Sequence, residues 1–176
     1  VEADTFFTST YWWLPEGESD PVKWPIPAKS QPDGIYKGQF LVSLKEDWSP
    51  AEGQNFKSGD VVAFDLDTFL ETRELPEVSL VFHPNERQAV NGVAVAKGTA
   101  LLSIDDNVRG KVMKLEPGEN GWTTEELTLP GTSGQAGIAF ADKDSETVFL
   151  NYEDFLTPDS LLRYEVGTGE ISTLKS

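Results

Sequence analysis

Short apolar runs bounded by Gly, Pro, Asp or Asn dominate the hydrophobic pattern of this chain. No stretch of the sequence shows the apolar i, i+3, i+4, i+7 spacing of an amphipathic helix. The 15 glycines and 11 prolines recur throughout and interrupt any pattern of helical length. The pattern therefore predicts an all-β protein.

Several of these runs recur in register. Segments 61–65, 112–116 and 161–165 each read apolar, apolar, variable, apolar, acidic. Upstream of them, segments 40–45, 100–105 and 148–153 each have three apolar residues, a small polar one, an apolar one and a charge. A third set consists of segments 92–95 and 137–140, with 34–36 as a weaker first member. A fourth set consists of segments 24–27, 80–84, 127–130 and 171–174. Each unit thus carries four short strands in a fixed order.

Four-stranded units at such a period predict the blades of a β-propeller, and a generic β-sandwich is the alternative. We expect an all-β partial β-propeller, with about three four-stranded antiparallel blades plus part of a fourth. Residues 31–84, 85–130 and 131–176 are the predicted blades, and residues 1–30 are the remnant of another, with 5–13 as an inner strand. Closed propellers have typically 4–8 blades, so the sequence is expected to be a fragment unless identical chains complete each other. Residues 93–95 and 138–140 should occupy corresponding positions, with Leu101 and Phe149 buried between sheets.

Composition narrows the function classes. The formal net charge of −16 argues against nucleic acid and anionic membrane surfaces as partners. Without cysteine, disulfides, thiolate chemistry and thiolate-bound zinc are excluded, and a single histidine, His83, leaves no multi-histidine metal site. We expect no cofactor. Nothing in the composition distinguishes a cytoplasmic from a periplasmic location.

Other candidate chemistry is weak. Residues 105–110 resemble the start of a calcium loop, but Arg109 stands where a ligand is needed, so a plain turn is expected; residues 142–146 also read as a turn. Acidic residues are too numerous for any carboxylate pair to indicate glycosidase chemistry. The five tryptophans could stack on sugars, although packing in the core is their commoner role. Trp12 and Trp13, adjacent on a strand, should point to opposite faces.

A specific resemblance lies at residues 147–164. Their aromatic strand leads through Phe155-Leu156-Thr157-Pro158 into a second strand, which resembles the last-blade signature of the prolyl oligopeptidase family. Residues 81–84 and 108–112, with Gly121-Trp122, resemble blades further upstream. The resemblance implies a seven-bladed propeller joined to an α/β-hydrolase domain with a serine, an aspartate and a histidine. It implies that the propeller caps the active site and restricts access to short peptides, and that this chain is roughly the second half of such a propeller.

The catalytic machinery of that family is missing from these residues. The sequence has no G-x-S-x-G nucleophile elbow, and residues 131–135 have the wrong spacing. His83, next to Pro84, is expected to be structural, so no catalytic residue is assigned. The chain is predicted to be a non-catalytic propeller segment of a serine peptidase, with the hydrolase domain and short peptides as partners. The alternative is a free-standing β-rich module that binds a protein or a carbohydrate.

The missing blades also predict self-association. Two bare terminal faces are expected, one carrying Tyr11, Trp12 and Trp13 with Phe6 and Phe7, the other carrying Phe140, Phe149, Tyr152 and Leu162. Because large apolar patches are rare on soluble monomers, the chain is expected to form a homo-oligomer.

Overall fold

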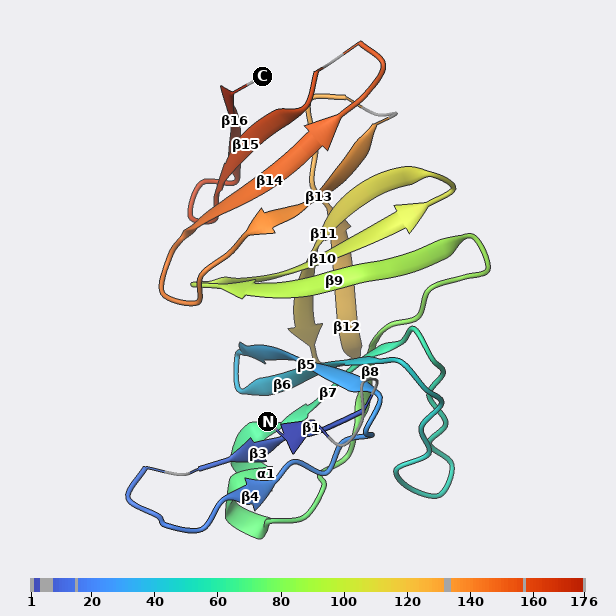
Figure 1. Cartoon of the computed structure of the whole chain (residues 1–176), viewed down its shortest axis with the longest axis vertical. Coiled ribbons are helices and arrows are strands. Elements are labelled where there is room, and N and C mark those ends of the chain that lie inside the picture. Colours follow the sequence, from blue (N-terminus) through green and yellow to red (C-terminus); the bar gives the residue numbers. More distant parts are fainter. Residues whose placement is uncertain (1, 4–7, 15, 132–133, 157, 176) are drawn as a thin grey trace.

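The computed structural model describes residues 2–3, 8–14, 16–131, 134–156 and 158–175. Within these ranges, three four-stranded antiparallel sheets follow one another along the chain, after four short strands. The sheets are stacked face against face, with the N-terminal strands at one end of the stack and the C-terminal sheet at the other (Figure 1). The fold is an open arc of propeller blades, and the all-β partial propeller predicted from the sequence is confirmed.

Each full sheet is built from consecutive strands that pair in chain order. The first contains β5 (Ser30–Tyr36), β6 (Gln39–Leu44), β7 (Val61–Asp65) and β8 (Ser79–Phe82). The second contains β9 (Gln88–Ala96), β10 (Thr99–Asp106), β11 (Arg109–Gly118) and β12 (Gly121–Glu126). The third contains β13 (Gln135–Phe140), β14 (Thr147–Glu153), β15 (Ser160–Glu165) and β16 (Glu170–Lys175).

The repeat found in the sequence maps onto these sheets strand by strand. Its members supply the first strands β5, β9 and β13, the second strands β6, β10 and β14, and the third strands β7, β11 and β15. Residues 93–95 and 138–140 occupy corresponding first strands, as predicted. The fourth strand predicted at 127–130 is wrong, because β12 ends at Glu126. Strand β12 is mostly polar and is fixed by a tight hairpin with β11, in which Gly118 pairs with Gly121.

The N-terminal residues form two small sheets. Strands β1 (Glu2–Ala3) and β2 (Ser9–Thr10) pair with each other, and β3 (Trp12–Trp13) pairs with β4 (Val22–Lys23). Of the single inner strand predicted at 5–13, residues 5–7 lie outside the described residues, and the rest is divided into β2 and β3. The side chains of Trp12 and Trp13 differ as predicted: Trp12 is 42% exposed, whereas Trp13 packs against the core.

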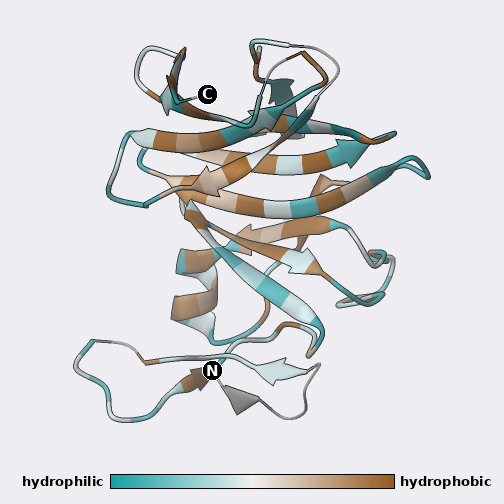
Figure 2. Ribbon diagram, turned by 45° about the horizontal axis from the view of Figure 1, so that its top comes forward, coloured by the Kyte–Doolittle hydropathy of each residue, from teal (hydrophilic) through white to brown (hydrophobic). Residues whose placement is uncertain are grey.

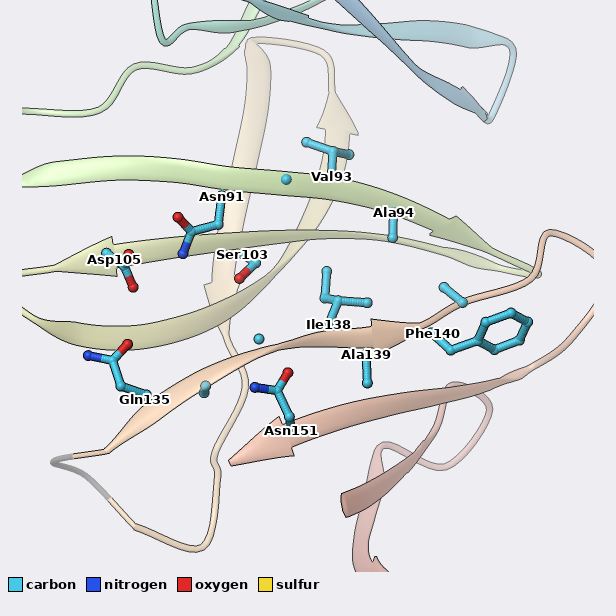
Figure 3. Close-up of a pocket in the computed structure, with 14 residues that line it drawn as sticks. Asn91, Val93, Ala94, Ser103, Asp105, Gln135, Ile138, Ala139, Phe140 and Asn151 are labelled. Carbon is cyan, nitrogen blue, oxygen red and sulfur yellow. The ribbon is translucent and has the colours of Figure 1, made fainter. Parts of the chain in front are cut away.

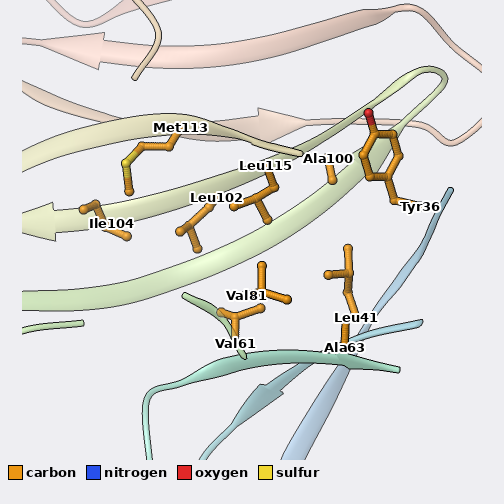
Figure 4. Packing of buried hydrophobic residues seen from close by; sticks show 10 residues of the cluster. All are labelled: Tyr36, Leu41, Val61, Ala63, Val81, Ala100, Leu102, Ile104, Met113 and Leu115. Carbon is orange, nitrogen blue, oxygen red and sulfur yellow. The ribbon is translucent and has the colours of Figure 1, made fainter. Parts of the chain in front are cut away.

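Side-chain alternation distributes each strand between two cores. On β10, Leu102 and Ile104 join Leu41 and Val61 in a cluster between the first and second sheets (Figure 4). Leu101, on the opposite face, joins the cluster between the second and third sheets. Apolar stretches therefore run through the inner strands, and the turns at their ends are hydrophilic (Figure 2). Each fully buried Leu or Val in these layers contributes about 1.5–3 kcal/mol.

The prediction that Phe149 lies between sheets is wrong. In β14 the buried row is Val148, Leu150 and Tyr152, and Phe149 is half-buried on the other face, beside the exposed Phe140. Tyr152 and Leu162, predicted for the bare terminal face, are buried against the second sheet instead. Since β13–β16 has a neighbouring sheet on one side only, only one face of β14 is covered by a described sheet.

One helix interrupts the strand pattern of the described residues. Helix α1 (Leu66–Thr72) follows β7 directly, in a chain whose apolar pattern predicted strands only. The Asp65 carboxylate accepts a hydrogen bond from the Thr68 amide at 2.8 Å, which caps the helix and holds the pKa of Asp65 below its usual range. Phe69 is buried beneath Trp24, so a seven-residue helix is stabilised by packing rather than by its own length.

Candidate functional site

A hollow of about 490 Å³ lies between the first strands of the second and third sheets. Strands β9 and β13 are edge strands of their sheets, and their central residues line it (Figure 3). The second strands β10 and β14 contribute Ser103, Asp105 and Asn151. We call this feature the inner hollow. Its position follows from the repeat, because the same two strands of each sheet supply its walls.

One end of the inner hollow is polar. Asn91, Ser103, Asp105, Gln135 and Asn151 gather there (Figure 3). The register of β9 against β10 shifts between Ser103 and Ile104, so Asn91 is an extra residue between two paired ones. A β-bulge of this kind re-aims the side chain that it carries, and Asn91 projects from the strand at the hollow.

A glycine makes room for the amide of Asn151. Gly137 on β13 pairs with Asn151 on β14. A Cβ atom at Gly137 would lie 2.9 Å from the Asn151 Oδ1 atom, closer than such atoms pack. The absence of a side chain at Gly137 therefore allows the Asn151 side chain to lie across β13 and reach the hollow.

The other end of the inner hollow is apolar. Val93 and Ala94 come from β9, and Ile138, Ala139 and Phe140 come from β13 (Figure 3). Phe140 is 57% exposed. Polar side chains at one end and apolar ones at the other make a site that can hold a short amphipathic group.

The first full sheet carries a related polar group around the partly buried Asp33. Asp33, next to a register shift in β5, accepts a 2.6 Å hydrogen bond from the Ser43 hydroxyl. Burial raises the pKa of Asp33 to about 7, although the Ser43 hydrogen bond and the charge of Lys45 act in the opposite direction. The other carboxyl oxygen, Oδ1, has no hydrogen-bond partner among the described residues. By the repeat, Ser43 corresponds to Ser103 and Lys45 to Asp105.

His83 belongs to a different part of the fold. Its Nδ1 atom lies 2.6 Å from Oδ1 of Asp60, which is 3% exposed, and the other carboxyl oxygen of Asp60 accepts from the Lys57 amide at 2.7 Å. The pair secures the end of the loop between β6 and β7 against the end of β8. Among the described residues, no serine hydroxyl forms a hydrogen bond with the His83 ring.

The acidic segments are turns, as predicted. In residues 105–110, Asp106 pairs with Arg109 across the β10–β11 hairpin, whose turn residues Asn107 and Val108 both have positive φ. In residues 142–146, the Asp142 side chain accepts from the Asp144 amide at 2.8 Å. The part of the chain that the structure describes holds no group of three metal-ligating side chains. Of residues 131–135, two lie outside the described residues.

Tryptophan serves mainly in packing. The Trp24 ring stacks on Phe40 with centroids 4.1 Å apart, and Trp48 contacts Phe56. Trp122 packs against the cluster between the first two sheets, and its Nε1 atom donates to Ser79 Oγ at 3.3 Å. Of the five tryptophans, all of which lie in the described ranges, Trp12 is the most exposed, at 42%. No described helix is long and apolar enough to cross a membrane.

Sequence reasoning assigned no residue to the inner hollow. A signal was present in the repeat, since the small polar residue and the charge of the second strand are Ser103 and Asp105. Only the stacking of the sheets shows that these two positions meet the first strands of the next blade.

Comparisons with known proteins agree with this architecture. The family model for the prolyl oligopeptidase N-terminal β-propeller domain matches residues 5–176. An uncharacterized peptidase of Sinorhizobium fredii is 34% identical over 97% of this chain, and the match spans 24% of that protein. Another uncharacterized peptidase, from Rickettsia prowazekii, is 23% identical over 85% of the chain and is matched over 21% of its own length.

A solved structure has the same fold. A post-proline cleaving enzyme from Rickettsia typhi superposes with a TM-score of 0.80 at 21% identity, covering 97% of this chain and 25% of that enzyme. The chain thus spans about a quarter of the length of the proteins it matches. Because the family model matches residues 5–176 and the sheets are arranged as propeller blades, this chain belongs to the prolyl oligopeptidase family and corresponds to its N-terminal β-propeller domain.

Proposed function

We propose that this chain is a non-catalytic part of the propeller of a prolyl oligopeptidase-type serine peptidase. It forms part of the lid and channel through which short peptides reach an α/β-hydrolase domain outside these residues. The observation that carries the proposal is the inner hollow. The blades of a propeller surround a central channel, and the hollow lies between the edge strands β9 and β13.

The surroundings of His83 support a non-catalytic role. A serine nucleophile needs a histidine base within hydrogen-bond reach. The single histidine of the chain is directed to Asp60, and within the described residues no hydroxyl group bonds to it. We therefore expect no labelling of the chain by a serine-directed fluorophosphonate probe.

The gating role is tested in the full-length parent enzyme with Ala94→Trp, which fills part of the inner hollow. We expect kcat/KM for a peptide of about eight residues to fall severalfold, with little change for a small chromogenic dipeptide, because only the longer substrate needs the full channel. Ala89→Trp, on an exposed position of the same strand outside the hollow, is the matched control. Equal effects of the two variants, or labelling of this chain by the probe, would contradict the proposal.

A further inference from the structure

The Asp105 carboxylate is an uncompensated charge in the wall of the inner hollow. It forms no hydrogen bond or ion pair with the described residues. The described residues that line the hollow include no lysine, arginine or histidine. A carboxylate that faces an open site without a partner is a ready binding group for a cation.

The nearby lysine is engaged by other acids. Lys111 lies 3.2 Å from both Asp106 Oδ2 and Glu126 Oε2. The pKa of Asp106 is held below its usual range, chiefly by the hydrogen bond from Gln88 and then by Lys111 and the charge of Arg109. Neighbouring residues of a strand point to opposite faces, so these contacts serve Asp106 and leave Asp105 on the side of the hollow.

The groups around Asp105 are suited to receive N–H donors. The Nε2 atom of Gln135 donates to the Val108 carbonyl oxygen, which leaves the carbonyl oxygen of the Gln135 amide as an acceptor. The side chains of Asn91 and Asn151 make no hydrogen bond with the described residues, and each offers one carbonyl oxygen. The wall of the inner hollow thus offers one carboxylate and three amide oxygens as acceptors for N–H donors.

The first full sheet provides an internal comparison. At the corresponding place, Asp33 has the Ser43 hydroxyl as a hydrogen-bond partner and the charge of Lys45 nearby. In the second sheet the sequence repeat aligns Asn91 with Asp33, although the two bulges lie about two residues apart in strand register. An acid, Asp105, stands where the first sheet has Lys45.

We infer that the inner hollow binds the cationic side chain of a short basic peptide, with Asp105 as its counter-charge and the apolar end holding a neighbouring aliphatic residue. This inference rests on the proposed function, in which peptides pass along these strands. It adds a preference: lysine- or arginine-containing peptides are retained in this part of the channel, and neutral or acidic ones are not. The net charge of −16 attracts such peptides at long range, and Asp105 provides the local contact.

The test measures binding of fluorescent six-residue peptides to the whole 176-residue chain by anisotropy, at about 0.15 M salt. The peptides alternate Ala with Lys, Gln or Glu and have blocked ends, so that only side-chain charge differs. We expect the Lys peptide to bind about tenfold more tightly than the Gln peptide, and Asp105→Asn to remove most of that difference.

The matched control is Glu119→Gln, which removes the same charge from the exposed turn between β11 and β12. It should leave the preference within about twofold of the original, because salt screens a distant exposed charge. Circular dichroism of both variants verifies that each is folded.

Three outcomes would overturn the inference, and they differ in what else they affect. If Asp105→Asn and Glu119→Gln lose the same amount of affinity for the Lys peptide, only the overall charge attracts the peptide. Equal affinity for the Lys and Gln peptides would remove the charge preference and leave the proposed channel role intact. Failure of every peptide to bind, at concentrations up to the millimolar range, would also count against the proposed contact between this chain and peptides.

Discussion

The backbone N–H of Gly110 donates to the Gly134 carbonyl oxygen at 3.1 Å, and this hydrogen bond joins the start of β11 to the segment that leads into β13. The two segments approach so closely that a Cβ atom at Gly110 would lie 2.1 Å from the Ala136 backbone nitrogen. Sheets two and three are therefore joined by main-chain contact as well as by the apolar cluster between them.

Replacing Gly110 with alanine should separate these two sheets. Since the obstructing atoms belong to the backbone and cannot rotate away, we expect Gly110→Ala to destabilise the fold by about 2–3 kcal/mol in urea unfolding. Gly92→Ala is the control, because no atom lies within 4 Å of a Cβ at that position. Unfolding midpoints that match within error would show that the approach of β11 to β13 is not tight in solution.

Trp24 is predicted to be the most important aromatic residue for the N-terminal end of the stack. Its ring stacks on Phe40 and Phe69, and it is 9% exposed. We expect Trp24→Ala to cost about 3–5 kcal/mol of unfolding free energy, since the substitution leaves a large cavity. Trp12→Ala, at a position that is 42% exposed, should cost less than about 1 kcal/mol. Equal unfolding midpoints for the two variants would argue against the packing of Trp24.

The raised pKa of Asp33 predicts a pH dependence of stability. Its pKa is 3.8 in the reference state and about 7 in the fold, so between these values the folded chain binds more protons than the unfolded chain. By linkage, the free energy of unfolding then falls as the pH rises through this window and levels off above about 7.

We expect the chain to lose on the order of 2 kcal/mol of stability between pH 5 and pH 8 through this group. Asp33→Asn, which is neutral at both values, should reduce the slope and be more stable than the original chain at pH 8. Thermal unfolding at several pH values measures this effect. A variant whose profile keeps the original slope would show that Asp33 titrates in its ordinary range.

Self-association is expected through the outer face of the third sheet. Leu161 is 38% exposed there, and Phe140 and Phe149 contact each other with ring centroids 6.5 Å apart. Covering such a patch gains about 25 cal/mol per Å² of apolar area. We therefore expect a dimer or larger assembly in sedimentation at micromolar concentration, and a shift toward monomer in the double variant Phe149→Ser/Leu161→Ser. A wild-type chain that sediments as a 19.4 kDa monomer at all concentrations would contradict the expectation.

The amino-acid pattern by itself determined the strands and their grouping. Short apolar runs bounded by turn residues, together with the recurring order of four segments, were sufficient to predict β5–β7, β9–β11 and β13–β15, because strand formation and hairpin pairing depend on residues close in sequence. The short helix α1 was missed since its seven residues owe their stability to the contact of Phe69 with Trp24, which is distant in sequence.

Which face of each strand is covered was decided only by the tertiary structure. In β14, Phe149 and Leu150 are both large and apolar, and only the second packs against a neighbouring sheet. A strand that has sheets on both sides needs apolar residues on both faces, so its sequence does not tell whether one of those sheets is present. The inner hollow depends on the same stacking: Asp105 and Gln135 are distant in sequence and line one hollow because the second and third sheets lie face to face.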